Sequence, residues 1–495
     1  MNLYEKLVQT ARQQPDHPAV VCPDQDEVYT YAQLCDMIDE VAAQLAAAGV
    51  SAGECVGLHA PSGLNYIVVN YALWRCGACV VPIPVELADV EKQALCERIR
   101  LEHIVSRDVS ANVFHPAVCG PVQKLADDNL LFPVRPLRDH PAGFADVNAA
   151  FIRFSSGTTG DSKGVVLSHE TILDRIHAAN DGMEICPQDR VIWLLSMSYH
   201  FAVSIVAYLT FGATTVICPR KTRLGSAIVD TTARYQGTII YGSPSHYLLM
   251  AADRSGQLLS HLRLAISTAS ALSSRTAAAF RDRFGIPLTQ AYGIIEVGLP
   301  CINLLWADQH VDAVGKLLPA YDLKLVDLGL GKGLKEIHIR GQGLLDAYYD
   351  PWRTRDRIMP DGWFATGDLG ELDSEGCLFI RGRSKEMINV GGMKYFPQEV
   401  EAVLESHPAV QEAAVYAHRS PQAEETGRAR VMLKPGVAQP PGEQDLRRYC
   451  ARRVTYFKVP ERIFFVATLP RTGSGKPLRR GMPIADDAAA ILENA

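Results

Sequence analysis

Short apolar runs alternate with helical stretches up to about residue 312, and this alternation limits the fold more than any other feature. Apolar runs at 56–58, 80–83 and 103–105 are separated by helical spacing, and the pattern continues at 191–195, 215–217, 238–241 and 264–267. One helical face is formed by Leu34, Met37, Ile38, Val41 and Leu45. Alternating strands and helices predict a layered α/β domain with a largely parallel sheet.

The pattern changes towards the C-terminus. Short apolar segments at 323–326, 336–339 and 377–380 alternate with Gly and Asp turns, which predicts a β-rich subdomain at about 313–382. A polar break follows, and helix and strand patterns then restart at 400–404, 410–416 and 445–453. We therefore expect a large N-terminal domain, 1–382, and a small α+β domain, 383–495.

Composition excludes several classes of protein. The 495 residues include 47% hydrophobic residues, which is enough for a large core that needs no stabilising disulfides or metal ions. The 49 basic and 55 acidic residues give a charge of -6, so no basic footprint for nucleic acid is present. No apolar run reaches the roughly 18 residues of a membrane span. The twelve cysteines are scattered and no secretory pattern opens the chain, which favours a reducing, cytoplasmic location.

The strongest chemical signal is a glycine- and hydroxyl-rich loop after the apolar run 149–152. Backbone N–H groups and hydroxyls can surround phosphate oxygens here, and the lysine adds positive charge. The loop differs from a Walker A loop, in which Ser or Thr follows the lysine, because Gly164 follows Lys163. The predicted phosphate-binding residues are Ser155, Ser156, Gly157, Thr158, Thr159, Gly160 and Lys163.

This loop resembles that of the adenylate-forming superfamily, which includes acyl-CoA synthetases, adenylation domains of nonribosomal peptide synthetases and beetle luciferases. Further segments resemble its motifs in the same order, at 30–34, 77–82, 292–296, 341–349, 363–368, 382–388, 397–401 and 469–476. The resemblance covers nearly the whole chain. It implies that a carboxylic acid and ATP form acyl-AMP and pyrophosphate, and that the acyl group then passes to a thiol.

The resemblance also implies roles for single residues. Tyr292 would stack on adenine, and Glu296, together with Thr158, would bind Mg²⁺. Lys476 would bridge the two reacting anions, while Lys385 would act as the hinge of the small domain. Further residues expected at the nucleotide are Ser270, Ala271, Gly293, Ile295, Asp368 and Arg383, and Gly391 and Gly392 are expected along the tunnel for the thiol.

The expected acyl pocket contains Tyr199, His200, Phe201, Tyr241, Gly242, Ser243 and Thr268, with His200 beside the substrate carboxylate. Amino-acid-activating relatives place an Asp after the aromatic residue of this motif, and this chain has none there. An unpaired ammonium would be costly to bury, so the sequence favours an apolar fatty, alicyclic or aryl acid.

Two departures stand beside the resemblance. Ile295 replaces the usual Thr, which removes about 1 kcal/mol of hydrogen bonding to phosphate. The segment Thr268-Ala269-Ser270-Ala271 replaces a glycine-rich one.

The expected small molecules are the acid, ATP, Mg²⁺ and coenzyme A. The alternatives are an acyl-AMP ligase that loads the phosphopantetheine of an acyl carrier protein, and an inactive nucleotide-binding regulatory protein. The oligomeric state stays open.

Overall fold

The computed structural model describes residues 2–108, 115, 117–154, 163–219, 223–305, 307–329, 334–390, 393–419 and 425–471. A nine-stranded sheet has the order β16-β15-β14-β13-β12-β10-β11-β1-β2. Its strands from β14 to β1 run parallel, as the alternating pattern predicts. The bounds are β1 (Pro18–Cys22), β2 (Glu27–Thr30), β10 (Arg190–Trp193), β11 (Thr214–Ile217), β12 (Ile239–Gly242), β13 (Leu264–Ser267), β14 (Thr289–Ile294), β15 (Gly298–Ile302) and β16 (Lys316–Leu317).

A second nine-stranded sheet has the order β20-β19-β9-β8-β4-β3-β5-β7-β6. Its central strands are parallel, while β8 and β9 form an antiparallel pair joined by the glycine-rich segment. The bounds are β3 (Cys55–His59), β4 (Cys79–Pro82), β5 (His103–Ser106), β6 (Gln123–Lys124), β7 (Leu130–Pro133), β8 (Ala149–Phe154), β9 (Gly164–Ser168), β19 (Ala347–Tyr348) and β20 (Arg353–Thr354).

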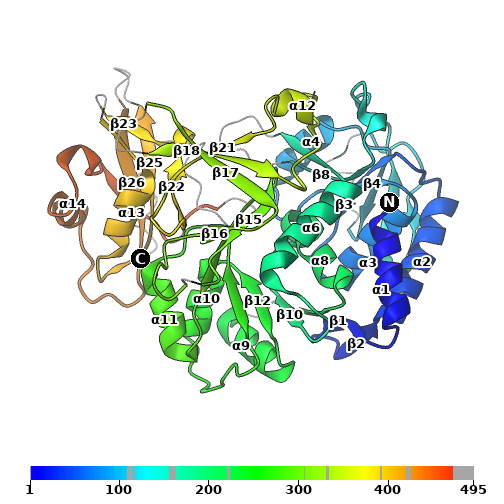
Figure 1. The fold of residues 1–495 in the computed structure, drawn as a ribbon, viewed down its shortest axis with the longest axis horizontal. Coiled ribbons are helices and arrows are strands. Elements are labelled where there is room, and N and C mark those ends of the chain that lie inside the picture. Colours follow the sequence, from blue (N-terminus) through cyan, green and yellow to red (C-terminus); the bar gives the residue numbers. More distant parts are fainter. Residues whose placement is uncertain are drawn as a thin grey trace.

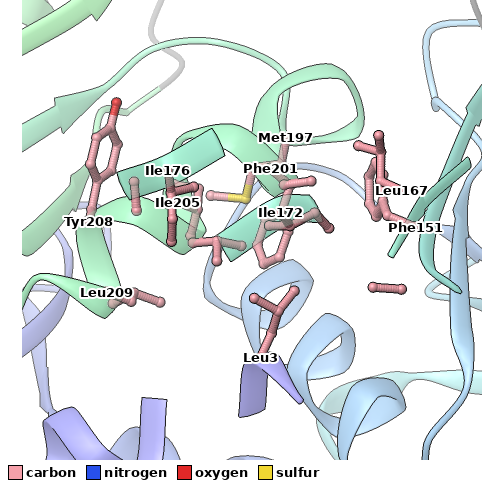
Figure 2. Close-up of a cluster of buried hydrophobic side chains, with 14 of the residues drawn as sticks. Leu3, Phe151, Leu167, Ile172, Ile176, Met197, Phe201, Ile205, Tyr208 and Leu209 are labelled. Atoms are coloured by element: carbon pink, nitrogen blue, oxygen red, sulfur yellow. The ribbon is translucent and has the colours of Figure 1, made fainter. Parts of the chain in front are cut away.

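Helices fill the space between the two sheets and contribute to the largest hydrophobic core (Figure 1). The predicted face of α2 is buried here, and Thr30 caps the helix through the backbone N–H of Gln33. Figure 2 shows part of this core, where Leu3, Ile172 and Phe201 lie close together. The helices are α1 (Leu3–Gln13), α2 (Tyr31–Ala47), α3 (Leu64–Arg75), α6 (His169–Met183), α7 (Met197–His200) and α8 (Ile205–Thr210).

The outer faces of both sheets are covered as well. Side chains of α9 (Leu224–Arg234), α10 (Pro244–Ala251) and α11 (Ser274–Phe284) pack on the first sheet around a separate core. Residues of α4 (Asp89–Glu97) pack on the second sheet. The short 3₁₀ helices are η1 (Ala126–Asp128), η2 (Phe144–Asp146), η3 (Phe201–Val203), η4 (Ser384–Glu386) and η5 (Tyr456–Lys458).

A four-stranded antiparallel sheet with the order β17-β18-β21-β22 follows. Its strands are β17 (Tyr321–Asp327), β18 (Lys335–Gly341), β21 (Phe364–Leu372) and β22 (Leu378–Arg383), with α12 (Arg355–Ile358) between β20 and β21. These strands lie in the range for which the sequence predicted a β-rich subdomain.

The C-terminal segment forms a smaller unit with its own hydrophobic core, which is drawn in orange beyond β22 (Figure 1). It contains β23 (Ile388–Val390), β24 (Met393–Tyr395), α13 (Pro397–Glu405), β25 (Val410–Arg419), β26 (Glu425–Leu433), α14 (Glu443–Ala451) and β27 (Ile463–Phe465). The chain therefore has the expected α/β class, with a large N-terminal and a small C-terminal domain. No helix in the described ranges is long and apolar enough to cross a membrane.

Candidate active site

Lys163 and Glu296 approach a common tyrosine, Tyr348. Lys163 is the first described residue after the predicted phosphate loop, and its Nζ lies 4.6 Å from the centre of the Tyr348 ring. The Tyr348 hydroxyl donates to Oε1 of Glu296 at 3.3 Å. Burial and the adjacent Glu296 raise the pKa of Tyr348, so this hydroxyl keeps its proton. A cation, a phenol and a carboxylate thus meet at Lys163, directly after the predicted loop.

The fold fixes these three groups through the backbone. Tyr348 pairs with Val165 across β19 and β9, which places its ring next to Lys163. Glu296 lies just after β14, and its carbonyl accepts from the Leu345 N–H at 2.7 Å. A Cβ at Gly164 would lie 3.0 Å from the side chains of both Phe154 and Tyr349, so a larger residue where β9 starts would push these side chains aside.

A buried arginine holds the loop after β14. Arg175, on α6, is 1% exposed and donates to the carbonyls of Ile295 and Gly343, each at 3.0 Å. Burial lowers the pKa of Arg175 to about 10, yet its hydrogen bonds satisfy the guanidinium. Arg175 therefore positions the segment that carries Glu296, although it lies outside the expected motifs.

A second network joins Tyr292, Asp368 and Arg383. The Tyr292 hydroxyl donates to Oδ2 of Asp368 at 2.6 Å, and Nε of Arg383 donates to Oδ1 at 2.8 Å. Tyr292 and Asp368 are 7% and 4% exposed. Burial first, and then Asp368, raise the pKa of Tyr292 well above its usual value, and the charge of Asp368 raises the pKa of Arg383. The carboxylate is thus held in one orientation from two sides.

The segments around this network are open or strained. Gly293, Ser270 and Ala271 are exposed, and Ile295 is half-buried. Ala269 has φ 72°, in the left-handed region that favours glycine. A Cβ at Gly293 would lie 2.8 Å from the Gly298 carbonyl, so that position also needs a glycine. Tight backbone of this kind beside β13 and β14 suits a flat ligand that approaches the main chain closely.

The expected acyl-pocket residues lie at the carboxyl ends of β10, β12 and β13, where open α/β sheets bind ligands. The half-buried His200 has its ring centre 6.4 Å from those of Trp193 and Tyr241. The Thr268 side chain interacts with the Tyr241 hydroxyl, and its N–H donates to the Gly242 carbonyl. Ser243 bonds to Ser245 and His246 at the start of α10.

Phe201 takes a different position. It is fully buried, and its ring centre lies 5.6–6.1 Å from those of Tyr66, Tyr71 and Trp74 in the core between the sheets. Figure 2 shows Phe201 in this core beside Met197 and Ile172. The structure thus brings His200, Tyr241 and Thr268 together, whereas Phe201 lies in the core. Tyr199 is 7% exposed.

Several predicted residues lie outside the described ranges: Ser155, Ser156, Gly157, Thr158, Thr159, Gly160, Gly391, Gly392 and Lys476. Lys385 is exposed in η4, directly after β22 and before the small unit. Sequence reasoning missed Tyr348 and Arg175 as site residues. Tyr348 does stand within the segment 341–349 that carries the resemblance, whereas nothing in the sequence marks Arg175.

Comparison with known proteins decides the family. Residues 7–349 match the family described as AMP-binding enzyme, and residues 399–476 match the AMP-binding enzyme C-terminal domain. The chain belongs to the AMP-binding enzyme family. The two matches fall on the large and the small domain respectively.

The similar proteins that carry names act on different acids. The chain is 29% identical to the sulfoacetate–CoA ligase of Cupriavidus necator, over 95% of each chain. It is also 29% identical to the 3-[(3aS,4S,7aS)-7a-methyl-1,5-dioxo-octahydro-1H-inden-4-yl]propanoyl:CoA ligase of Rhodococcus jostii, over 92% of this chain and 93% of that one. Among solved structures, the anthranilate CoA ligase AuaEII in complex with anthranoyl-AMP has a TM-score of 0.77 and 25% identity, over 97% of this chain and 96% of that one.

Proposed function

We propose that this protein is an AMP-forming acid–thiol ligase. It joins a carboxylic acid to AMP from ATP, releases pyrophosphate, and transfers the acyl group from acyl-AMP to the sulfur of coenzyme A. The observation that carries this proposal is the pairing of two separate networks, Tyr292–Asp368–Arg383 and Lys163–Tyr348–Glu296, within a family that binds AMP. The first network suits a nucleoside and the second suits its phosphates.

The nucleoside network acts through orientation. Asp368 receives one donor on each oxygen and still has lone pairs for the two ribose hydroxyls. The buried Tyr292 ring, fixed at its hydroxyl, offers a face for adenine. Ser270, Ala271 and Gly293 expose the neighbouring backbone, so the base can lie close to the main chain.

The phosphate network fits Mg²⁺. One oxygen of Glu296 accepts from Tyr348, and its other lone pairs suit a hard cation. No cluster of three acidic, His or Cys side chains that could hold a metal occurs among the described residues. ATP oxygens and water would supply the ligands that Glu296 and Thr158 do not. When bound, the ion would neutralise phosphate charge. Thr158 is the second proposed metal-binding residue, and Lys163 adds a fixed positive charge.

The acid would lie with its carboxylate beside His200 and its body against Tyr199, Tyr241, Gly242 and Thr268. These groups are aromatic, small or weakly polar, which suits an apolar fatty, alicyclic or aryl acid. Two of the named relatives, a ligase for an alicyclic propanoate and one for an aromatic acid, support this class, whereas the ligase named for sulfoacetate acts on a small charged acid.

The small domain would serve the two half-reactions in two orientations. We propose domain limits of 1–382 and 383–495, with Lys385 as the hinge, because it is exposed between β22 and the separate C-terminal core. Lys476 would relieve the repulsion between carboxylate and phosphate in the first step. Gly391 and Gly392 would line the path of the thiol in the second. The twelve cysteines lie in the described ranges and form no disulfide there, which is consistent with the proposed reducing compartment, the cytoplasm.

Pyrophosphate release tests this function. The purified protein and MgATP are incubated with fatty acids of increasing length, benzoate, cinnamate and amino acids, with and without coenzyme A, beside a Lys476→Ala variant. Release that depends on an apolar acid, rises with coenzyme A and falls in the variant supports the proposal. Acyl-AMP that only a phosphopantetheinylated carrier protein discharges moves the assignment to a carrier-protein ligase. ATP binding without turnover of any acid favours the inactive regulatory protein.

A further inference from the structure

Arg153 is a partly buried cation whose hydrogen bonds are incomplete. It lies on β8, immediately before Phe154 and the predicted phosphate loop. One terminal nitrogen donates to the carbonyl of Tyr199, and the guanidinium lies 5.9 Å from the centre of the Tyr199 ring. Its Nε is buried without a hydrogen-bond partner. Burial lowers the pKa of Arg153 to about 10, as it does for Arg175, so the missing partner of Nε is what distinguishes the two side chains.

Three other arginines of the described chain are compensated by hydrogen bonds or ion pairs. Arg175 donates to the carbonyls of Gly343 and Ile295 through all three of its nitrogens. Arg283 and Arg263 form ion pairs with buried carboxylates, those of Asp253 and Asp189. Arg153 forms no ion pair with any carboxylate in the described ranges. A partly buried charge with no carboxylate within ion-pair distance is costly, so the site suits an anion that arrives with a ligand.

The position of Arg153 narrows the choice of anion. Tyr199, whose carbonyl it holds, directly precedes His200, and His200 faces Tyr241 in the proposed acyl pocket. On its other side, Arg153 interacts electrostatically with Glu296, the proposed ligand of the phosphate-bound metal. Arg153 therefore lies between the acid site and the phosphate site. The reacting carboxylate and the α-phosphate of ATP are the two anions that meet there.

We propose that Arg153 binds the carboxylate of the acid substrate and orients it for attack on ATP. This inference rests on the proposed function. In the step it serves, a carboxylate oxygen forms a bond to the α-phosphorus, the bond from that phosphorus to the bridging oxygen breaks, and pyrophosphate leaves with the electron pair. The acid thereby loses its free negative charge. Arg153 consequently acts before and during adenylation and has no carboxylate to hold during thioester formation.

This separation of the half-reactions defines the test. The variants are Arg153→Gln, which removes the charge, Arg153→Lys, which keeps it, and the control Arg190→Gln. Arg190 is exposed at the start of β10, and its side chain donates to the Tyr235 carbonyl and the Gln236 side chain. Each variant is assayed for pyrophosphate release with the most active acid of the panel above, and for thioester formation from coenzyme A and the synthetic acyl-AMP of that acid.

For Arg153→Gln we expect the KM for the acid to rise about tenfold or more, because a hydrogen bond to a charged group is lost. The KM for ATP should stay within about twofold, and thioester formation from supplied acyl-AMP should be retained. Arg153→Lys should recover part of the affinity. The primary amide of the same acid, tested as a competitive inhibitor, should bind the wild type more weakly than the acid does, and Arg153→Gln should remove that preference.

Other results overturn the inference. A raised KM for ATP with an unchanged KM for the acid would assign Arg153 to a phosphate. Equal losses in both half-reactions, with the preference for acid over amide intact, would make its role structural. An active wild type beside an unaffected Arg153→Gln variant would refute the inference and leave the proposed function standing. A wild type that turns over no acid would refute both.

Discussion

Removing one hydroxyl at Tyr292 tests the nucleoside network most directly. Tyr292→Phe keeps the buried ring and deletes the donor that lies 2.6 Å from Oδ2 of Asp368. A hydrogen bond to a charged group contributes about 1.5–3 kcal/mol. Arg383 still holds the other oxygen at 2.8 Å, so the lower end of that range applies. At about 1.4 kcal/mol per factor of ten, the KM and the dissociation constant for ATP should rise about tenfold.

A matched control separates binding from stability. Tyr31 is fully buried in the core between the sheets, and its hydroxyl donates to the carbonyls of Leu209 and Ala213 at 3.3 and 2.9 Å. Tyr31→Phe should lower the urea midpoint, because it leaves carbonyls without that donor, and should leave the KM for ATP unchanged. Both variants are measured by ATP-dependent pyrophosphate release, by equilibrium ATP binding and by urea unfolding.

The reasoning fails if Tyr292→Phe binds ATP as the wild type does while losing stability like the control. Asp368 would then be a structural carboxylate that closes the contact between β14 and β21, and the ribose hydroxyls would need other acceptors. A rise in the KM for ATP without any loss of stability would be the strongest support, since it would show that the hydroxyl serves the ligand more than the fold.

Three further changes probe other parts of the molecule. Tyr348→Phe removes the 3.3 Å hydrogen bond to Glu296 and should lower the rate of pyrophosphate release about fivefold and raise the Mg²⁺ requirement; an unchanged Mg²⁺ titration would contradict this. Ala269→Gly relieves a left-handed residue with φ 72° and should raise the free energy of unfolding by about 0.5 kcal/mol, and a lower urea midpoint would count against the strain. Burial raises the pKa of Glu405 from 4.5 to about 7, so folding binds a proton and stability should fall by about 3 kcal/mol as the pH rises through those values. Glu405→Gln should flatten that dependence, and an equal slope in both proteins would refute it.

Much of the fold could be predicted because long-range packing and local pattern agree. The apolar runs at 56–58, 80–83 and 264–267 became β3, β4 and β13 with boundaries within one residue. Two-residue strands such as β6 and β16 are too short to show a period, so the edges of both sheets could not be predicted.

The site was predictable only as a set of segments. The contact between Tyr292 and Asp368 joins residues 76 apart in the chain, and that between Tyr348 and Glu296 joins residues 52 apart. Phe201 shows the limit most clearly. It follows His200 directly, but α7 passes into η3 here, so neighbouring side chains leave the backbone in different directions. One ring then faces Tyr241, while the other enters the core.

The number of hydrogen-bond partners that each charged side chain has explains why Asp368 is stable in its position and why Arg153 differs from it. Asp368 can lie buried because Tyr292 and Arg383 each donate to one of its oxygens. This network is therefore stable without a bound ligand. Arg153 is held by a single carbonyl, so the apo protein carries a charge that it does not fully compensate. A charged side chain of that kind lowers the stability of the fold unless a substrate anion binds to it. Arg153→Leu should therefore unfold at a higher urea concentration than the wild type and also bind the acid more weakly. If Arg153 were structural, the same substitution would lower both the urea midpoint and the affinity for the acid.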